Sequence, residues 1–168
     1  TDRVASAFGP FTLLWFIALS VTGLVSVFQN PEILKAVNPY YAIRFFIDHG
    51  LAGFLILSQV ILCSTGAEAL YADMGHLGRK PISRAWRFVF IALVLNYMGQ
   101  GAFILRSGGF KNALFEMVQS QFSLIYIPFL LLTLVATIIA SQALISGVYS
   151  IVNQGISYGV FPRMKVDF

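Results

Sequence analysis

Glu68 places a carboxylate in a stretch of chain that otherwise has the composition of a membrane-spanning segment. An ionisable residue at membrane depth costs about 3 kcal/mol on insertion scales, so it is normally retained for a function. Thr65 and Gly66 come just before it, and a β-branched residue followed by glycine favours a helix break. A break frees backbone carbonyls, which join the Thr65 hydroxyl and the Glu68 carboxylate as hard oxygen ligands. We therefore predict a break around residues 64–66 and a monovalent-cation or proton site in a transport pathway.

Glu68 also has a structural alternative, in which its carboxylate is neutralised by burial or paired with a basic neighbour for assembly. Tyr71 lies three residues further along the same helical face, where it either hydrogen-bonds to Glu68 or packs against neighbouring side chains. Asp73 either pairs with a basic residue or forms a cytoplasmic gate. Ser141 joins Tyr71 and Asp73 as a secondary pathway candidate. It belongs to a set of polar residues that either join helices or line the pathway: Asn96, Gln100, Ser141, Gln142 and Ser146.

The residue pattern gives no support for enzyme or cofactor chemistry. His49 and His76 fall on opposite sides of the membrane in the topology argued below, so they cannot share a haem or a zinc ion. The single cysteine, Cys63, lies in an apolar run and by itself forms neither a disulfide nor a metal site. No phosphate-binding loop, nucleophile elbow or HExxH pattern occurs. We predict a protein that is not an enzyme and holds no cofactor apart from the ions it transports.

The composition is that of an integral membrane protein. Of 168 residues, 58% are hydrophobic and 11% are charged, whereas a soluble domain carries about 25% charged residues. The net charge of +4 comes mainly from short connections between apolar segments, where basic residues set topology. The expected surroundings are therefore the lipid bilayer, and nucleic acid is not an expected partner.

Four apolar segments predict an all-α fold in a single transmembrane region. The uninterrupted apolar part of the second segment, residues 51–62, is too short to cross about 30 Å of hydrocarbon. That crossing has to include the Ser-Thr-Gly-Ala-Glu piece, so the broken helix is itself a span. The four predicted spans are 8–28, 50–75, 83–105 and 123–151.

The connections and the first span carry further signals. Pro31 and Pro39 predict two short helices between the first two spans, extending through Val37 and Asp48. The aromatic residues of the second short helix indicate that it lies at the membrane surface. Asn112 predicts the N-cap of another short helix through residue 118. Small residues in the first span predict close helix packing: Gly9, Thr12, Ser20, Thr22, Gly23 and Ser26.

The basic residues predict the orientation. With a cytoplasmic N-terminus, seven of the eleven Lys and Arg residues lie on the inside, and the loop 79–87 has the highest density of them. We expect loop 75–83 and both ends of the chain to be cytoplasmic, with helices one and three running outward and two and four inward. The chain does not begin with Met and ends at residues 166–168 just after a helix, which we interpret as the ends of a piece of a longer protein.

The chain contains four long motifs: Thr65-Gly-Ala-Glu-Ala-Leu-Tyr-Ala-Asp-Met-Gly-His-Leu-Gly-Arg-Lys-Pro-Ile82, Leu95-Asn-Tyr-Met-Gly-Gln-Gly-Ala102, Ala136-Thr-Ile-Ile-Ala-Ser-Gln-Ala-Leu-Ile-Ser-Gly147 and Gly159-Val-Phe-Pro-Arg163. These motifs resemble the signatures of the KUP/HAK/KT potassium-uptake transporters. The resemblance covers nearly the whole chain in order. One departure is Asn112-Ala-Leu-Phe115, where the family usually has Asn-Pro-Phe-Phe in an outer loop.

The resemblance implies more than the residues alone. It implies a LeuT-like inverted-repeat transporter of the APC superfamily with about twelve helices, of which this chain would supply the fifth to eighth. It implies potassium uptake at the cell membrane coupled to proton symport. Thr65, Gly66 and Glu68 would lie in the ion pathway, with Thr65 and Glu68 as potassium ligands. An acid and a tyrosine on a first helix outside this chain would complete the site.

Two other interpretations stay open. The first is an amino-acid carrier of the same fold, although such a carrier would be expected to have a glycine-rich half-helix start aimed at a carboxylate. The second is a membrane anchor subunit that transports nothing and in which Glu68 is dispensable. The expected partners are the potassium ion, the proton and the bilayer, together with a homodimer formed through regions outside this chain.

Overall fold

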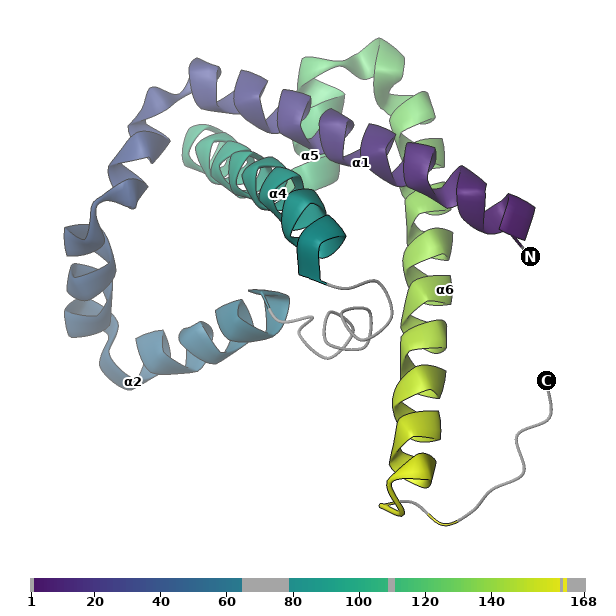
Figure 1. Ribbon diagram of the computed structural model, residues 1–168. Helices are drawn as coiled ribbons and strands as arrows, with labels where there is room; N and C mark the ends of the chain where they lie inside the picture. Colours follow the sequence, from purple (N-terminus) through teal and green to yellow (C-terminus); the bar gives the residue numbers. More distant parts are fainter. Residues whose placement is uncertain (1, 65–78, 109–110, 161, 163–168) are drawn as a thin grey trace.

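The computed structural model describes residues 2–64, 79–108, 111–160 and 162. Every regular element within these ranges is helical (Figure 1). The elements in chain order are α1 (Asp2–Gln29), η1 (Pro31–Val37), α2 (Pro39–Ser64), α4 (Arg79–Ser107), α5 (Ala113–Gln121), η2 (Ser123–Ile125) and α6 (Tyr126–Ser157).

Four described segments are long and apolar enough to cross a membrane: Phe8–Gln29, Pro39–Val60, Lys80–Ser107 and Ser123–Ser157. The prediction of an all-helical membrane protein is therefore confirmed. The helices extend beyond the predicted spans, because a helix can continue past the apolar stretch that crosses the hydrocarbon. The end predicted for the second span, residue 75, lies outside the described residues.

A sharp corner divides α2 at Gly50. Gly50 has φ 49° and ψ −123° inside an otherwise helical stretch, a conformation that glycine adopts at little steric cost. The result is a short helical piece from Pro39 followed by a second piece that extends to Ser64, and the corner is visible in Figure 1. A short helix from Pro39 followed by a second helix after Gly50 agrees with the sequence prediction for these elements.

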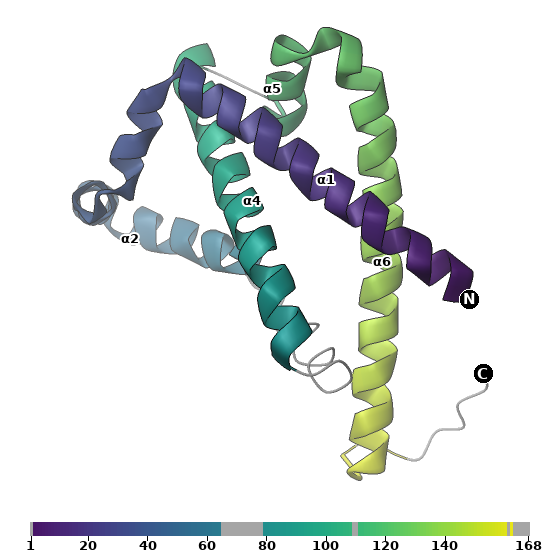
Figure 2. The same cartoon turned by 45° about the horizontal axis from the view of Figure 1, so that its top comes forward.

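Helices α1 and α4 form the most extensive packing between two described elements. Ser26 lies opposite Gly99 and Asn30 lies opposite Ala102, so residue numbers rise together along both helices and the pair is parallel. Figure 2 shows the C-terminal ends of α1 and α4 on the same side of the molecule. Because the pair is parallel, the chain has to return between the end of α1 and the start of α4.

The apolar core lies where α5 meets α1, α4 and α6. It consists of Leu19, Phe103, Met117, Val118 and Phe129, and the Trp15 ring is tilted against the Phe129 ring with 5.3 Å between the ring centroids. These residues come from all four helices, so the core joins α1 to α6.

Asn112 caps α5, as predicted. Its side-chain oxygen accepts from the Phe115 backbone N–H at 3.4 Å, and Glu116 Oε1 accepts from the Lys111 and Asn112 backbone N–H groups at 3.0 and 3.3 Å. This reciprocal arrangement is a variant of the capping box, with the acid at N4 instead of N3. The helix continues to Gln121, three residues beyond the predicted end at Val118, and its buried residues are Ala113, Met117 and Val118.

Candidate functional site

The centre of the predicted ion site lies outside the described residues. Thr65, Gly66, Glu68, Tyr71 and Asp73 all belong to the stretch between the described parts of α2 and α4. The helix break at residues 64–66, the cation site and the cytoplasmic gate therefore stay predictions. The structure describes only the helices that flank them.

Ser141 is the one predicted pathway residue that the structure describes. It is exposed on α6, as are Gln142 and Ser146. The Ser146 hydroxyl donates to the Gln142 backbone carbonyl at 3.0 Å, a bond within its own helix. No hydrogen bond joins these side chains to another described element, so contact between helices and lining of a pathway both remain open for them.

Asn96 lies in the interface between α1 and α4. Its side chain is 4% exposed, and its Oδ1 has no hydrogen-bond partner among the described residues. Beside it the Ser26 hydroxyl, which is buried, donates to the Gly99 carbonyl at 2.7 Å, and Asn30 Nδ2 donates to the Ala102 carbonyl at 3.4 Å. Ser26 and Asn30 therefore join the two helices by hydrogen bonds. Asn96 is buried between the helices without a partner for its Oδ1, so both interpretations that the sequence allowed for it stay open.

Two glycines allow the backbones of α1 and α4 to touch. A Cβ placed on Gly23 would overlap the Leu95 carbonyl, and one placed on Gly99 would overlap the backbone of Gly23. Contact of this kind is how membrane helices gain dispersion energy and short polar contacts. The prediction of close packing from the small residues of the first span is confirmed for Gly23 and Ser26.

Sequence reasoning missed one contact at the ends of this helix pair. The Arg106 guanidinium donates to the side-chain carbonyl of Gln29 and lies 5.9 Å from the centre of the Phe103 ring. The signal was present, because Gln29 and Arg106 each follow an apolar segment directly and are expected on the same side of the membrane.

Acidic side chains described by the structure lie in the connections and near the helix ends. Glu32 pairs with Lys35 at 3.0 Å, Asp48 lies 3.5 Å from Arg44, and Glu116 belongs to the α5 capping box. Within the described ranges, no group of three His, Cys, Asp or Glu residues could hold a metal ion. The described helices thus supply a packed scaffold, and Glu68 and Asp73 are the carboxylates that fall within the predicted spans.

Comparison with known proteins covers the whole chain. The family model described as the K+ potassium transporter integral membrane domain matches residues 1–168. The probable potassium transport system protein Kup of Geotalea uraniireducens is 66% identical over 168 residues, which are 100% of this chain and 28% of that protein. The protein of the same name from Methanosarcina barkeri is 60% identical over 167 residues, 99% of this chain and 28% of that protein.

The probable potassium transport system protein Kup 2 of Geobacter sulfurreducens is 66% identical over 168 residues, again 100% of this chain and 28% of that protein. The chain thus spans a little more than a quarter of the length of these relatives. No solved structure matches it.

Proposed function

Because the chain belongs to the K+ potassium transporter family, we propose that it forms part of a multi-pass membrane protein that takes up potassium ions across the cell membrane. The observation that carries the proposal is the family match along residues 1–168. Relatives at 60–66% identity are described as probable potassium transport system proteins, and the described chain has four membrane-capable helices.

The proposed ion pathway passes Thr65, Gly66 and Glu68. Unpaired carbonyls at a helix break, a hydroxyl and a carboxylate together offer oxygen ligands without a soft donor, which suits potassium better than a transition metal. Glu68 also offers a place for a proton, so uptake is proposed to be coupled to proton symport. Tyr71, Asp73 and Ser141 are secondary candidates along the pathway.

The fold we propose for the longer protein is a LeuT-like inverted repeat. The parallel packing of α1 and α4 supports the expected directions of the first and third spans, which both run outward when the N-terminus and loop 75–83 are cytoplasmic. Such a protein would be a transporter and not an enzyme, with potassium and protons as cargo and no resident cofactor.

The test is potassium-dependent growth of a transport-deficient bacterial host that expresses the full-length parent protein. We expect growth at limiting potassium, together with uptake of rubidium that unlabelled potassium inhibits. An empty vector controls for leak, and a membrane blot controls for expression. A parent that reaches the membrane but neither rescues growth nor takes up rubidium would contradict the proposal, and uptake of an amino acid instead would support the alternative carrier.

A further inference from the structure

A groove lies between η1, the start of α2 and the end of α4. It has a volume of about 500 Å³, within the range of about 300–1,000 Å³ that is usual for ligand sites. Its apolar floor is formed by Ile33 and Ala36 of η1 and by Gly101, Ile104 and Leu105 of α4. The transport proposal makes no use of it.

The floor of the groove is fixed by close contacts. Asn30 Nδ2 donates to the Ala102 carbonyl at 3.4 Å, which ties the start of η1 to α4. A Cβ on Gly101 would lie 2.8 Å from Ile33 Cδ1, so Ile33 rests directly on the glycine backbone. The floor of the groove is therefore formed where the Ile33 side chain packs against the backbone of α4 at Gly101.

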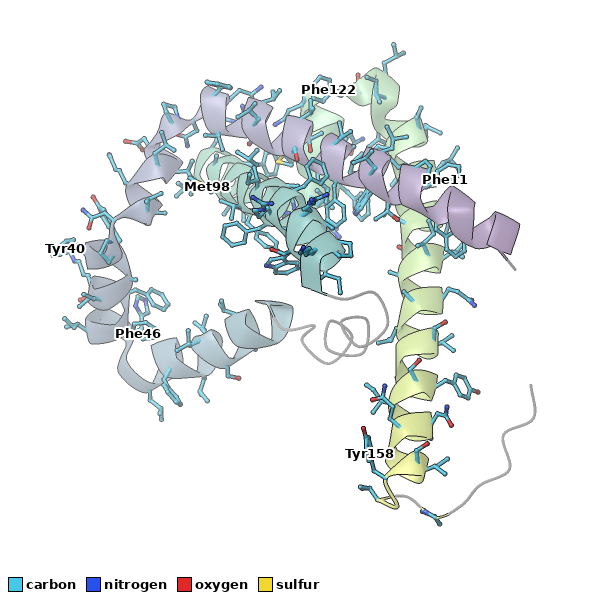
Figure 3. The ribbon with its side chains drawn as sticks, viewed as in Figure 1. Phe11, Tyr40, Phe46, Met98, Phe122 and Tyr158 are labelled. Atoms are coloured by element: carbon cyan, nitrogen blue, oxygen red, sulfur yellow. The ribbon has the colours of Figure 1, made fainter. Side chains whose placement is uncertain are left out.

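The surroundings of the groove are those of a membrane interface. It follows the end of α1 directly, and α2 begins beside it with Tyr40 and Tyr41, whose rings lie 5.8 Å apart. Figure 3 shows Tyr40 and Phe46 on the short first piece of α2, before the corner at Gly50. Tyrosines at the ends of spans are typical of the level of the lipid headgroups.

The rim of the groove carries one charge of each sign. Lys35 Nζ donates to Glu32 Oε1 at 3.0 Å, and both side chains are exposed. The hydrogen bond to Glu32 and its negative charge raise the pKa of the Lys35 ammonium, so the ammonium stays protonated at neutral pH. Tyr41 adds a hydroxyl-bearing ring to the same lining.

We propose that this groove binds a zwitterionic phospholipid of the phosphatidylethanolamine type. Its acyl chain would lie on Ile33, Gly101 and Leu105, its phosphate would contact Lys35 and its ammonium would contact Glu32. In the complex, the Glu32–Lys35 ion pair opens, and each of the two side chains contacts the headgroup charge of opposite sign. An anionic headgroup lacks the ammonium and meets the Glu32 carboxylate, so anionic lipids bind less well.

Lipid binding to the purified, delipidated full-length parent protein tests this proposal by native mass spectrometry. Phosphatidylethanolamine and phosphatidylglycerol with the same acyl chains are titrated separately. The double variant Glu32→Gln, Lys35→Gln removes the rim charges at exposed positions without touching the packed floor. The matched control is Arg44→Gln, Asp48→Asn, which removes another exposed pair, 3.5 Å apart, outside the lining of the groove.

We expect the delipidated protein to bind one molecule of phosphatidylethanolamine and to bind phosphatidylglycerol more weakly. The rim double variant should bind phosphatidylethanolamine about fivefold more weakly, as for the loss of one exposed ionic contact, and the control pair should bind it like the wild type. Equal binding of both lipids, no lipid bound, or unchanged binding by the rim variant would overturn the proposal. If no lipid binds, another part of the parent protein is the occupant of the groove. Because no transport is measured, each outcome is independent of the transport proposal.

Discussion

Two cations compete for the Glu68 carboxylate in the proposed mechanism, because a potassium ion favours the charged form and a proton removes the charge. Glu68→Gln keeps the shape but can neither titrate nor attract the ion electrostatically. We expect rubidium uptake by the full-length parent to fall roughly tenfold and to lose its pH dependence, in line with ordinary coupling free energies. Uptake measured across the neutral pH range gives both quantities.

Thr65→Val is the comparison for Glu68→Gln. It removes a coordinating oxygen and no titrating group, so rubidium affinity should drop while the pH dependence stays largely in place. If Glu68→Gln instead transports with the wild-type rate and the wild-type pH response, the carboxylate is structural.

Ser26 offers a second test at the scale of one residue. Its hydroxyl donates to the Gly99 carbonyl on the neighbouring helix, whereas the Ser20 hydroxyl donates to Phe16 within α1. Ser26→Ala should lower the free energy of unfolding by about 0.6–1.5 kcal/mol, the usual range for a hydrogen bond between membrane helices. Ser20→Ala is the matched control and should change it by less. Unfolding of the parent in mixed micelles measures both, and equal losses would mean that the contact between helices contributes nothing.

Among the helices, the pairing of α1 with α4 depends on the absence of side chains at Gly23 and Gly99. Gly23→Ala would push a methyl group into the Leu95 carbonyl, and backbone cannot move aside as a flexible side chain does. We expect a loss of about 1–3 kcal/mol in the free energy of unfolding, as for other overpacked contacts.

Gly147→Ala is the control for Gly23→Ala, because nothing lies within 4 Å of an added Cβ there. Alanine also favours the helix relative to glycine by up to about 1 kcal/mol, so this variant should be neutral or more stable. The same mixed-micelle unfolding applies to both. A Gly23→Ala variant as stable as Gly147→Ala would show that α1 and α4 do not touch at this point.

The helices could be predicted from the sequence wherever a local signal acts. Pro31 and Pro39 mark helix starts, and Asn112 has the side chain that caps α5. The apolar run predicts a fourth span over residues 123–151 and does not locate the end of the helix. The helix continues to Ser157 and closes in a Schellman motif, in which the Gly159 N–H donates to the Ile156 carbonyl and the Val160 N–H to that of Gly155. The end of the helix is therefore set by Gly159, which takes φ 73°, and not by the end of the apolar run.

Partners far apart in sequence were not predictable in the same way. The small residues of the first span indicated a close contact, but nothing local identifies Gly99 as the partner of Gly23, because 76 positions separate them. The candidate site depends on spacing within one short stretch, so Thr65, Gly66 and Glu68 could be proposed together. The acid and the tyrosine that would complete the site are expected on a helix outside this chain, so no spacing within this sequence could locate them.

For the whole molecule, orientation in the membrane is the property that connects helix directions to transport. α1 and α4 are parallel, so Gln29 and Arg106 emerge on one side and the chain between them must cross back. The four basic residues of 79–87 are then expected on the opposite side, which the positive-inside rule predicts to be cytoplasmic. In that orientation the proposed broken helix would run inward, toward the side to which the proposed transporter delivers potassium.

Cysteine accessibility in the full-length parent tests this orientation. In a background without other reactive cysteines, Gly78→Cys should be protected from a membrane-impermeant thiol reagent in intact cells and labelled after permeabilisation. Lys111→Cys, on the expected outer side, should be labelled in intact cells. Both positions are polar connections between spans, so a difference between them reports the side of the membrane and not burial. Labelling of Gly78→Cys from outside, with Lys111→Cys protected, would reverse all four helices, and the proposed break would then face the wrong side for an inward-running pathway.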